Sequence, residues 1–120
     1  MDRREFLENF DVAESSINEG YIEHVLEMSI NASVEKNGTP RGQHQLIICM
    51  EELSEMQKEI SKSLRGKGDH VNILEELADI CIIQRYIQLL ENINMEELNK
   101  AINVKIRRLH TKLVEDGKFD

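Results

Sequence analysis

Apolar residues recur every three or four positions in four separate stretches of this 120-residue chain. The interval matches the repeat of an α-helix, so each stretch predicts a helix with one apolar face. The apolar positions are Ile22, Val25, Leu26, Ile30 and Val34; Leu46, Cys49, Met50, Leu53, Met56 and Ile60; Ile73, Ile80, Ile83 and Ile87; and Leu98, Ile102, Ile106, Leu109 and Leu113. No strand-like alternation stands out, so the sequence predicts an all-α fold.

Helix-breaking and capping residues place the ends of these helices. Glycine and proline fall between or after the stretches, at Gly38, Pro40, Gly66, Gly68 and Gly117. Asn72 and Asn94 are each followed three residues later by a glutamate, which is the spacing of a capping box at a helix start. We therefore expect helices over about residues 21–37, 42–62, 72–92 and 94–116.

We expect a single domain over residues 1–120. Four helices joined by short connections favour an antiparallel four-helix bundle-like domain. Residues 1–20 are weakly patterned, and Phe6, Leu7 and Phe10 predict only a short amino-terminal helix there. The helix over about 72–92 is apolar almost all round, so we expect an oligomer, either a homodimer or a homotetramer, that buries part of this surface.

Charge and composition exclude several kinds of partner. The formal net charge of -8 at pH 7 argues against a nucleic-acid duplex or an anionic membrane, because either favours a basic face. No apolar run approaches the ~20 residues that span a bilayer, and the amino terminus lacks an apolar signal core. A cytoplasmic location is therefore expected. Cys49 and Cys81 lie in apolar segments without a CxxC partner, which predicts buried thiols and no disulfide.

Two acidic residues occupy positions where the third long helix should be apolar. Glu76 lies within one helical turn of Ile73 and Ile80, and Asp79 lies within one turn of Ile83. Burying an unpaired carboxylate costs several kcal/mol even after the protein relaxes. Two such groups one turn apart therefore need protonation, a basic partner or a cation.

The preceding helix carries a matching pair of acids. Glu52 and Glu55 are also three residues apart, and Glu59 extends the acidic row. In an antiparallel hairpin Glu52 would lie level with Asp79, and Glu55 with Glu76. The midpoint of both pairs falls in the glycine-containing linker, where such a hairpin should turn. The sequence thus predicts four carboxylates at one height between two helices.

The ligand chemistry of this cluster selects the ion. Four carboxylates offer only oxygen atoms, which suit Mg²⁺, with Mn²⁺ as a substitute. Zinc and iron are disfavoured, because the chain has no Cys/His cluster and no histidine three residues after a glutamate. The other interpretation is a surface acidic patch neutralised by Lys58, Lys62 or Arg85.

The segments EELSE, at residues 51–55, and EELAD, at residues 75–79, resemble the ExxE, spacer, ExxD signature of the MazG-like all-α NTP pyrophosphatases. This superfamily also includes dimeric dUTPases, dCTP pyrophosphatases and phosphoribosyl-ATP pyrophosphohydrolases. The resemblance covers about residues 42–113. It implies an enzyme that hydrolyses an NTP or dNTP to the monophosphate and pyrophosphate. The metal ligands and catalytic residues that it implies are Glu52, Glu55, Glu76 and Asp79.

The resemblance also implies that basic residues of the last helix contact the substrate phosphates, and here the candidates are Lys105 and Arg108. We consider His44, Gln45 and Tyr86 as candidates for a base pocket, although a satisfied polar group or a core aromatic is the simpler interpretation of each. Two alternative functions stay open. One is a non-catalytic helical dimerisation or interaction module, and the other is a phosphoribosyl-ATP-type pyrophosphohydrolase with the same metal chemistry.

Overall fold

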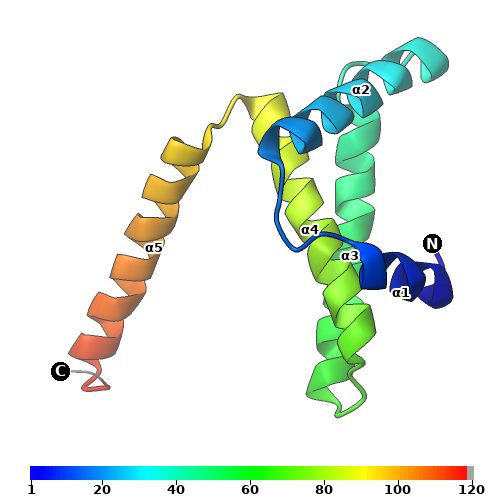
Figure 1. Cartoon of the computed structure of the whole chain (residues 1–120). Coiled ribbons are helices and arrows are strands. Elements are labelled where there is room, and N and C mark those ends of the chain that lie inside the picture. Colours follow the sequence, from blue (N-terminus) through cyan, green and yellow to red (C-terminus); the bar gives the residue numbers. More distant parts are fainter. Residues whose placement is uncertain (119–120) are drawn as a thin grey trace. The chain divides into compact units, whose positions relative to one another are not determined.

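The fold is all-α, as the sequence predicts. The computed structural model describes residues 1–118, and within them every regular element is a helix (Figure 1). The helices are α1 (Arg3–Val12), α2 (Glu19–Asn37), α3 (Gln43–Leu64), α4 (His70–Glu91) and α5 (Met95–Glu115). They form two compact units, Met1–Leu90 and the segment from Glu91 onward, and each unit is described by itself.

Asparagine side chains cap the starts of α2 and α5, and of these two caps the sequence predicts the one at Asn94. The Asn18 side chain accepts a hydrogen bond of 3.0 Å from the backbone N–H of Tyr21 and so caps α2. The Asn94 side chain accepts one of 2.8 Å from the backbone N–H of Glu97 and caps α5 in the same way, which confirms the predicted start of that helix. These bonds satisfy backbone donors that have no partner within the first helical turn. Gly38, with φ of +63°, ends α2 at the predicted place.

The predicted capping box at Asn72 is wrong. Helix α4 begins at His70, because Asp69 Oδ1 accepts hydrogen bonds from the backbone N–H groups of Val71 and Asn72 at 3.0 and 3.2 Å. Arg3 donates a hydrogen bond of 2.7 Å to the other oxygen of Asp69. The cap of α4 therefore also ties α1 to the start of α4.

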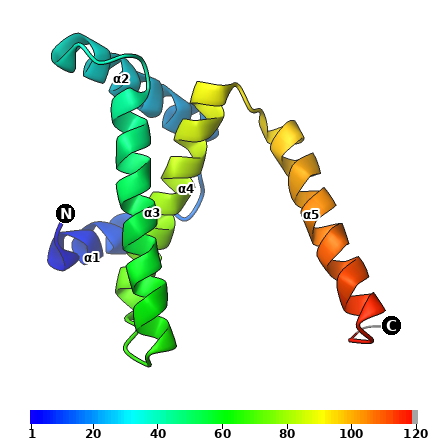
Figure 2. The ribbon, with the colours of Figure 1, turned by 180° about the vertical axis from the view of Figure 1, so that it is seen from behind.

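Helices α3 and α4 run antiparallel and are joined by a short turn over residues 65–69 (Figures 1 and 2). Gly66 in this turn has a φ of +73°, a backbone conformation that favours glycine. The side of α3 that becomes buried repeats at intervals of four and three residues. We call these positions the α3 seam: Gln45, Cys49, Glu52, Met56 and Glu59.

The predicted apolar core on α3 is largely wrong. Leu46, Met50, Leu53 and Ile60 are 42 to 71% exposed, and of the predicted stripe only Cys49 is buried. The exposed residues lie one position round the helix from the seam, so the packed side of α3 is the more polar one. Cys49 is buried as predicted, whereas Cys81 is exposed.

The buried apolar core is small and lies where α2 crosses the end of the hairpin at which α3 begins and α4 ends (Figures 1 and 2). Its members are Leu26 and Ile30 from α2, Cys49 from α3 and Ile83 from α4. None of the helices in residues 1–118 combines the length and the apolar character that crossing a membrane requires.

Polar side chains add to this contact between α2 and the hairpin. Gln45 is 2% exposed, and its Nε2 donates hydrogen bonds to the Ser33 hydroxyl at 2.8 Å and to the Ser29 carbonyl at 3.2 Å. The Tyr86 hydroxyl of α4 donates one of 2.9 Å to the Ser29 hydroxyl. The three helices are thus linked through Ser29.

We expect Tyr86→Phe to lower the free energy of unfolding by about 1 kcal/mol, because it removes one partly buried hydrogen bond and little else. Urea denaturation of the purified protein measures this change. In a Ser29→Ala background the same substitution should cost much less, because its partner is already gone. Tyr21→Phe is the control, since Tyr21 is 66% exposed. Equal effects of Tyr86→Phe in both backgrounds would contradict the assigned bond.

Candidate metal centre

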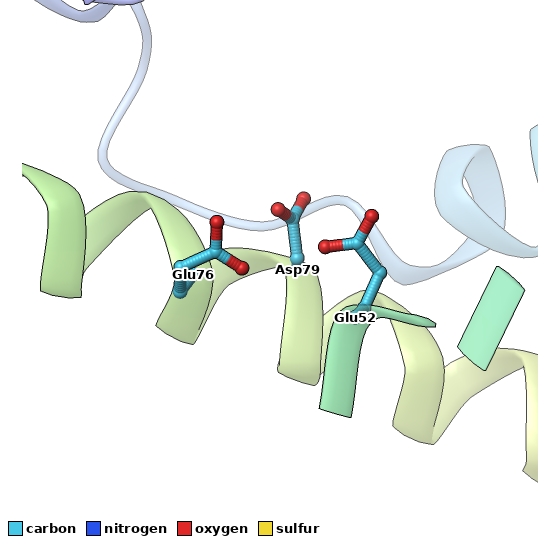
Figure 3. A group of neighbouring side chains, drawn as sticks. All are labelled: Glu52, Glu76 and Asp79. Carbon is cyan, nitrogen blue, oxygen red and sulfur yellow. The ribbon is translucent and has the colours of Figure 1, made fainter. Parts of the chain in front are cut away.

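Three of the four predicted carboxylates come together between α3 and α4. Glu52 belongs to the α3 seam, while Glu76 and Asp79 lie three residues apart on one side of α4. One oxygen from each lies within 4.8 Å of the other two, and all three residues are half-buried. Figure 3 shows the Glu52 carboxylate reaching from α3 toward that of Asp79, with Glu76 beside them on α4. The predicted level pairing of Glu52 with Asp79 is confirmed.

The pKa of Glu52 reflects the burial of this carboxyl group and the negative charges around it. Burial raises that pKa most, and the charge of Asp79 and a hydrogen bond with Asp79 raise it further, to about 7. The charges of Glu76 and Glu55 act in the same direction. A hydrogen bond between two carboxyl groups needs a proton on one of them, so the cluster holds a proton at a pH where ordinary glutamates are ionised.

Glu76 lies in a similar environment. Burial is the main cause that raises its pKa, followed by the charge of Asp79 and then by those of Glu55, Glu75 and Glu59. Its Oε2 atom is shielded from solvent and has no hydrogen-bond partner. A shielded carboxylate oxygen without a donor is unfavourable, so this atom is available to a cation.

Basic residues do not neutralise the three clustered carboxylates. Within residues 1–118, no lysine or arginine forms an ion pair with Glu52, Glu76 or Asp79. The candidate cations pair elsewhere: Lys58 with Glu55 at 3.3 Å, Lys62 with Glu59 at 3.2 Å, and Arg85 with Glu19 at 2.6 Å. The interpretation as an acidic patch neutralised by neighbouring basic residues therefore fits Glu55 and Glu59 better than it fits Glu52, Glu76 and Asp79.

Glu55 stands apart from the cluster. Its side chain is about half exposed and pairs with Lys58, and it is not one of the residues whose oxygens lie within 4.8 Å of one another. Its charge nevertheless raises the pKa values of Glu52 and Glu76. Its assignment as a metal ligand stays a prediction.

The other predicted site residues lie in different surroundings. Lys105 and Arg108 are exposed on α5, in the second unit. His44 is exposed near the start of α3, whereas Gln45 and Tyr86 belong to the polar contact with α2. Tyr86 and the side-chain nitrogen of Gln45 thus help to hold α2 against the hairpin, whereas Gln45 Oε1 is shielded from solvent and has no hydrogen-bond partner. The phosphate and base contacts of all five stay predictions.

Glu59 is more important to the packing of α3 than the sequence indicates. From the sequence it only extends the acidic row, but the structure buries this residue, with 7% exposed. The signal that locates Glu59 is its spacing of seven residues from Glu52, two helical turns, which puts both on the same side of α3.

Comparisons of the chain with protein-family models, with curated proteins and with solved structures find no match. The clustered donors are all carboxylate oxygens, and hard divalent cations such as Mg²⁺ prefer oxygen ligands. The shielded oxygen of Glu76 and the crowded charges fit such an ion.

We expect Glu52→Gln to stabilise the ion-free protein above neutral pH. Because the pKa of Glu52 rises from 4.5 to about 7 on folding, the folded chain holds a proton that the unfolded chain has lost between these values. The resulting stabilisation is complete below about pH 4.5 and is lost as the pH rises through about 7.

The glutamine side chain has no proton to lose, so it stays uncharged at every pH. It should therefore need more urea to unfold than the wild-type protein at about pH 8 in EDTA, with the difference shrinking toward about pH 4.5. Glu23→Gln, an exposed change on α2, should show no such pH dependence. A Glu52→Gln variant less stable than wild type at the higher pH would refute the electrostatic account.

Proposed function

We propose that the protein is a Mg²⁺-dependent nucleoside triphosphate pyrophosphohydrolase. It cleaves an NTP or dNTP between the α and β phosphates, giving the monophosphate and pyrophosphate. The observation that carries the proposal is the group of Glu52, Glu76 and Asp79 oxygens within 4.8 Å of one another, without basic partners. The similarity of EELSE and EELAD to the MazG-like signature supports the same conclusion.

In this proposal Glu52, Glu76 and Asp79 hold Mg²⁺ and Glu55 completes the site. When bound, Mg²⁺ neutralises the phosphate oxygens and stabilises the charge that develops as the α–β bond breaks. Without cations, the clustered carboxylates would repel a polyphosphate. The half-buried position of the cluster limits the water around it, which strengthens the electrostatic interactions there.

Carboxylates and phosphates are both negatively charged, so the proposed site also needs cationic side chains that bind the phosphate groups of the substrate. Lys105 and Arg108 lie at i and i+3, on one side of α5. Arginine can bind two phosphate oxygens at once, and lysine acts as a point charge. We propose these two residues as phosphate contacts. The proton acceptor for the attacking water would be Glu55 or Glu51, the remaining carboxylates of the EELSE segment.

Incubation with a panel of NTPs and dNTPs plus Mg²⁺ should release pyrophosphate as the first product. Asp79→Asn should lower the rate about 100-fold or more, because it removes a charged ligand and leaves the size of the side chain unchanged. Glu35→Gln, an exposed change on α2, should retain the wild-type rate. Orthophosphate as the first product, or full activity in Asp79→Asn, would contradict the proposed reaction.

We further propose that the active form is an oligomer of bundle-like subunits. The support is the exposed apolar stripe of α3, formed by Leu46, Met50, Leu53 and Ile60. Several large apolar side chains left exposed along one side of a helix are a common feature of interaction sites. A second copy of the chain is the simplest partner for it, because closed homo-oligomers are common among soluble proteins.

Light scattering after size-exclusion chromatography should give a mass above that of one 13.9 kDa chain. Leu53→Lys should shift the mass toward the monomer, because it places a charge in the centre of the apolar stripe. Val12→Lys is the matched control, since Val12 is 82% exposed on α1. A wild-type protein that is monomeric, or a Leu53→Lys variant of unchanged mass, would argue against this interface.

The exposed apolar stripe also favours a second candidate, a non-catalytic helical interaction module. In that case the acids only keep the surface hydrated. Calorimetry with Mg²⁺ and a non-hydrolysable NTP analogue separates the two candidates. Binding that disappears in Asp79→Asn supports the hydrolase, and absence of nucleotide binding at millimolar Mg²⁺ supports the module.

A further inference from the structure

The exposed apolar stripe of α3 follows a heptad pattern. Leu64, the last residue of the helix, extends the stripe, and Gln57 fills its one polar position. The positions then advance by alternating steps of four and three residues: Leu46, Met50, Leu53, Gln57, Ile60 and Leu64. Gln57 is exposed, and the five apolar side chains are 42 to 85% exposed. This alternation is the pattern by which two helices pack side by side, here over about 27 Å.

The six positions also define how a second α3 would fit. If the second helix runs antiparallel and the pair is centred on Glu55, each position of the stripe has a partner at its own level. The levels pair Leu46 with Leu64, Met50 with Ile60, and Leu53 with Gln57. A shift of one heptad leaves two apolar positions without a partner, so this register is the one that buries the whole stripe.

Two charged residues beside the stripe agree with the same register. Glu51 and Lys58 are seven residues apart and lie on one side of α3, separated from the stripe by a row that includes Ser54. In the antiparallel pair, Glu51 of each copy lies within one residue of the level of Lys58 of the other. A parallel pair would bring Glu51 against Glu51 and Lys58 against Lys58, which is unfavourable. The charges therefore select the antiparallel orientation.

We propose that α3 packs antiparallel against α3 of a second copy of the chain, around a two-fold axis at the level of Glu55. The two-fold axis makes every contact twice, so the interface holds two pairs of Glu51 with Lys58 of the other copy. The inference rests on the oligomer proposed above and adds the orientation, the register and the residue pairs of its interface.

Lys58 changes its partner in this interface. Within one chain it pairs with Glu55 at 3.3 Å, and the two side chains are 64 and 49% exposed. Exposed pairs of this kind contribute little to stability, so the ammonium group can turn to another carboxylate. Within residues 1–118, Glu51 forms no ion pair. Assembly thus releases Glu55, the carboxylate that completes the proposed metal centre.

Charge reversal tests the pairing of Glu51 with Lys58. Glu51→Lys and Lys58→Glu should each weaken self-association about tenfold or more, because like charges then face each other across the interface. An equimolar mixture of the two variants should associate about as tightly as the wild-type protein, since every lysine then faces a glutamate. Sedimentation velocity over a range of concentrations measures these changes. Glu23→Lys, an exposed change on α2, should have no such effect. Single variants that associate like the wild type would contradict the pairing.

Single cysteines test the orientation directly. In a Cys81→Ser background, which removes the exposed native thiol, Ser54→Cys should be linked between copies by a short bismaleimide, because both copies of this residue lie beside the two-fold axis. Ser61→Cys is the matched control, since it lies one heptad further on the same side of α3. Its two copies should be about 18 Å apart along the helix axis, beyond the reach of the linker. Denaturing electrophoresis shows the linked dimer.

The outcomes separate this interface from the proposed oligomer and from the proposed reaction. Linking at both serine positions would mean a parallel pair, and linking at neither in an oligomeric protein would mean that another surface, such as α5 of the second copy, covers the stripe. Either result would overturn this interface alone. A monomeric wild-type protein would overturn the interface and the oligomer together. Linking at Ser54→Cys only, in a protein that releases no pyrophosphate, would support the interface and contradict the hydrolase.

Discussion

Repulsion between carboxylates is the interaction on which the rest of this structure depends. Helices that pack as a hairpin usually face each other with apolar side chains, but here the facing positions include Glu52 and Glu59 on α3 and Glu76 and Asp79 on α4. Two unit charges about 4 Å apart interact with about 4 kcal/mol at the effective dielectric constant of a protein surface. Protonation of Glu52 and the ion pair of Glu59 with Lys62 relieve part of this repulsion, and a cation would relieve more.

Stabilising contacts lie at both ends of the hairpin. At one end α2 crosses it, with Ile30 fully buried and with hydrogen bonds that converge on Ser29. At the other end the short turn over residues 65–69 joins the helices, and Arg3 bonds to Asp69 beside it. The carboxylates lie between these two anchors. Such an arrangement supports the backbone around the carboxylates from both ends, so that in the proposed metal centre they would be held in place before an ion binds and little ordering would be needed.

The sequence predicts the helices and the hairpin well, because both depend on local signals. Three- and four-residue spacing, an asparagine cap at Asn94 and a glycine at the turn each act over a few residues. It also predicts that Glu52 faces Asp79, since a short turn leaves little freedom of register. It fails on which side of α3 is packed. The apolar stripe that contains Leu53 is offset by one residue from the α3 seam, which contains Glu52. Only the way in which α2 and α4 pack against α3 decides which of the two sets is buried. The exposure of Cys81 and the burial of Glu59 follow from that choice. The spacing of Glu59 from Glu52 puts both on one side of α3, but it does not show that this side is the packed one.

The acidic seam also explains why so much apolar surface of α3 lies outside the core. A helix whose packed side carries carboxylates cannot use the same positions to bury leucine and isoleucine, and Leu53 and Ile60 lie on the neighbouring side, about half exposed. Burial of such residues against another subunit would contribute about 25 cal/mol for each Å² of apolar surface removed from water. That contribution would offset the repulsion within the seam without placing apolar groups among the carboxylates. A small helical chain can therefore keep a charged site between two helices if its stability comes partly from assembly, and the proposed metal centre and the proposed oligomer then have a common physical origin.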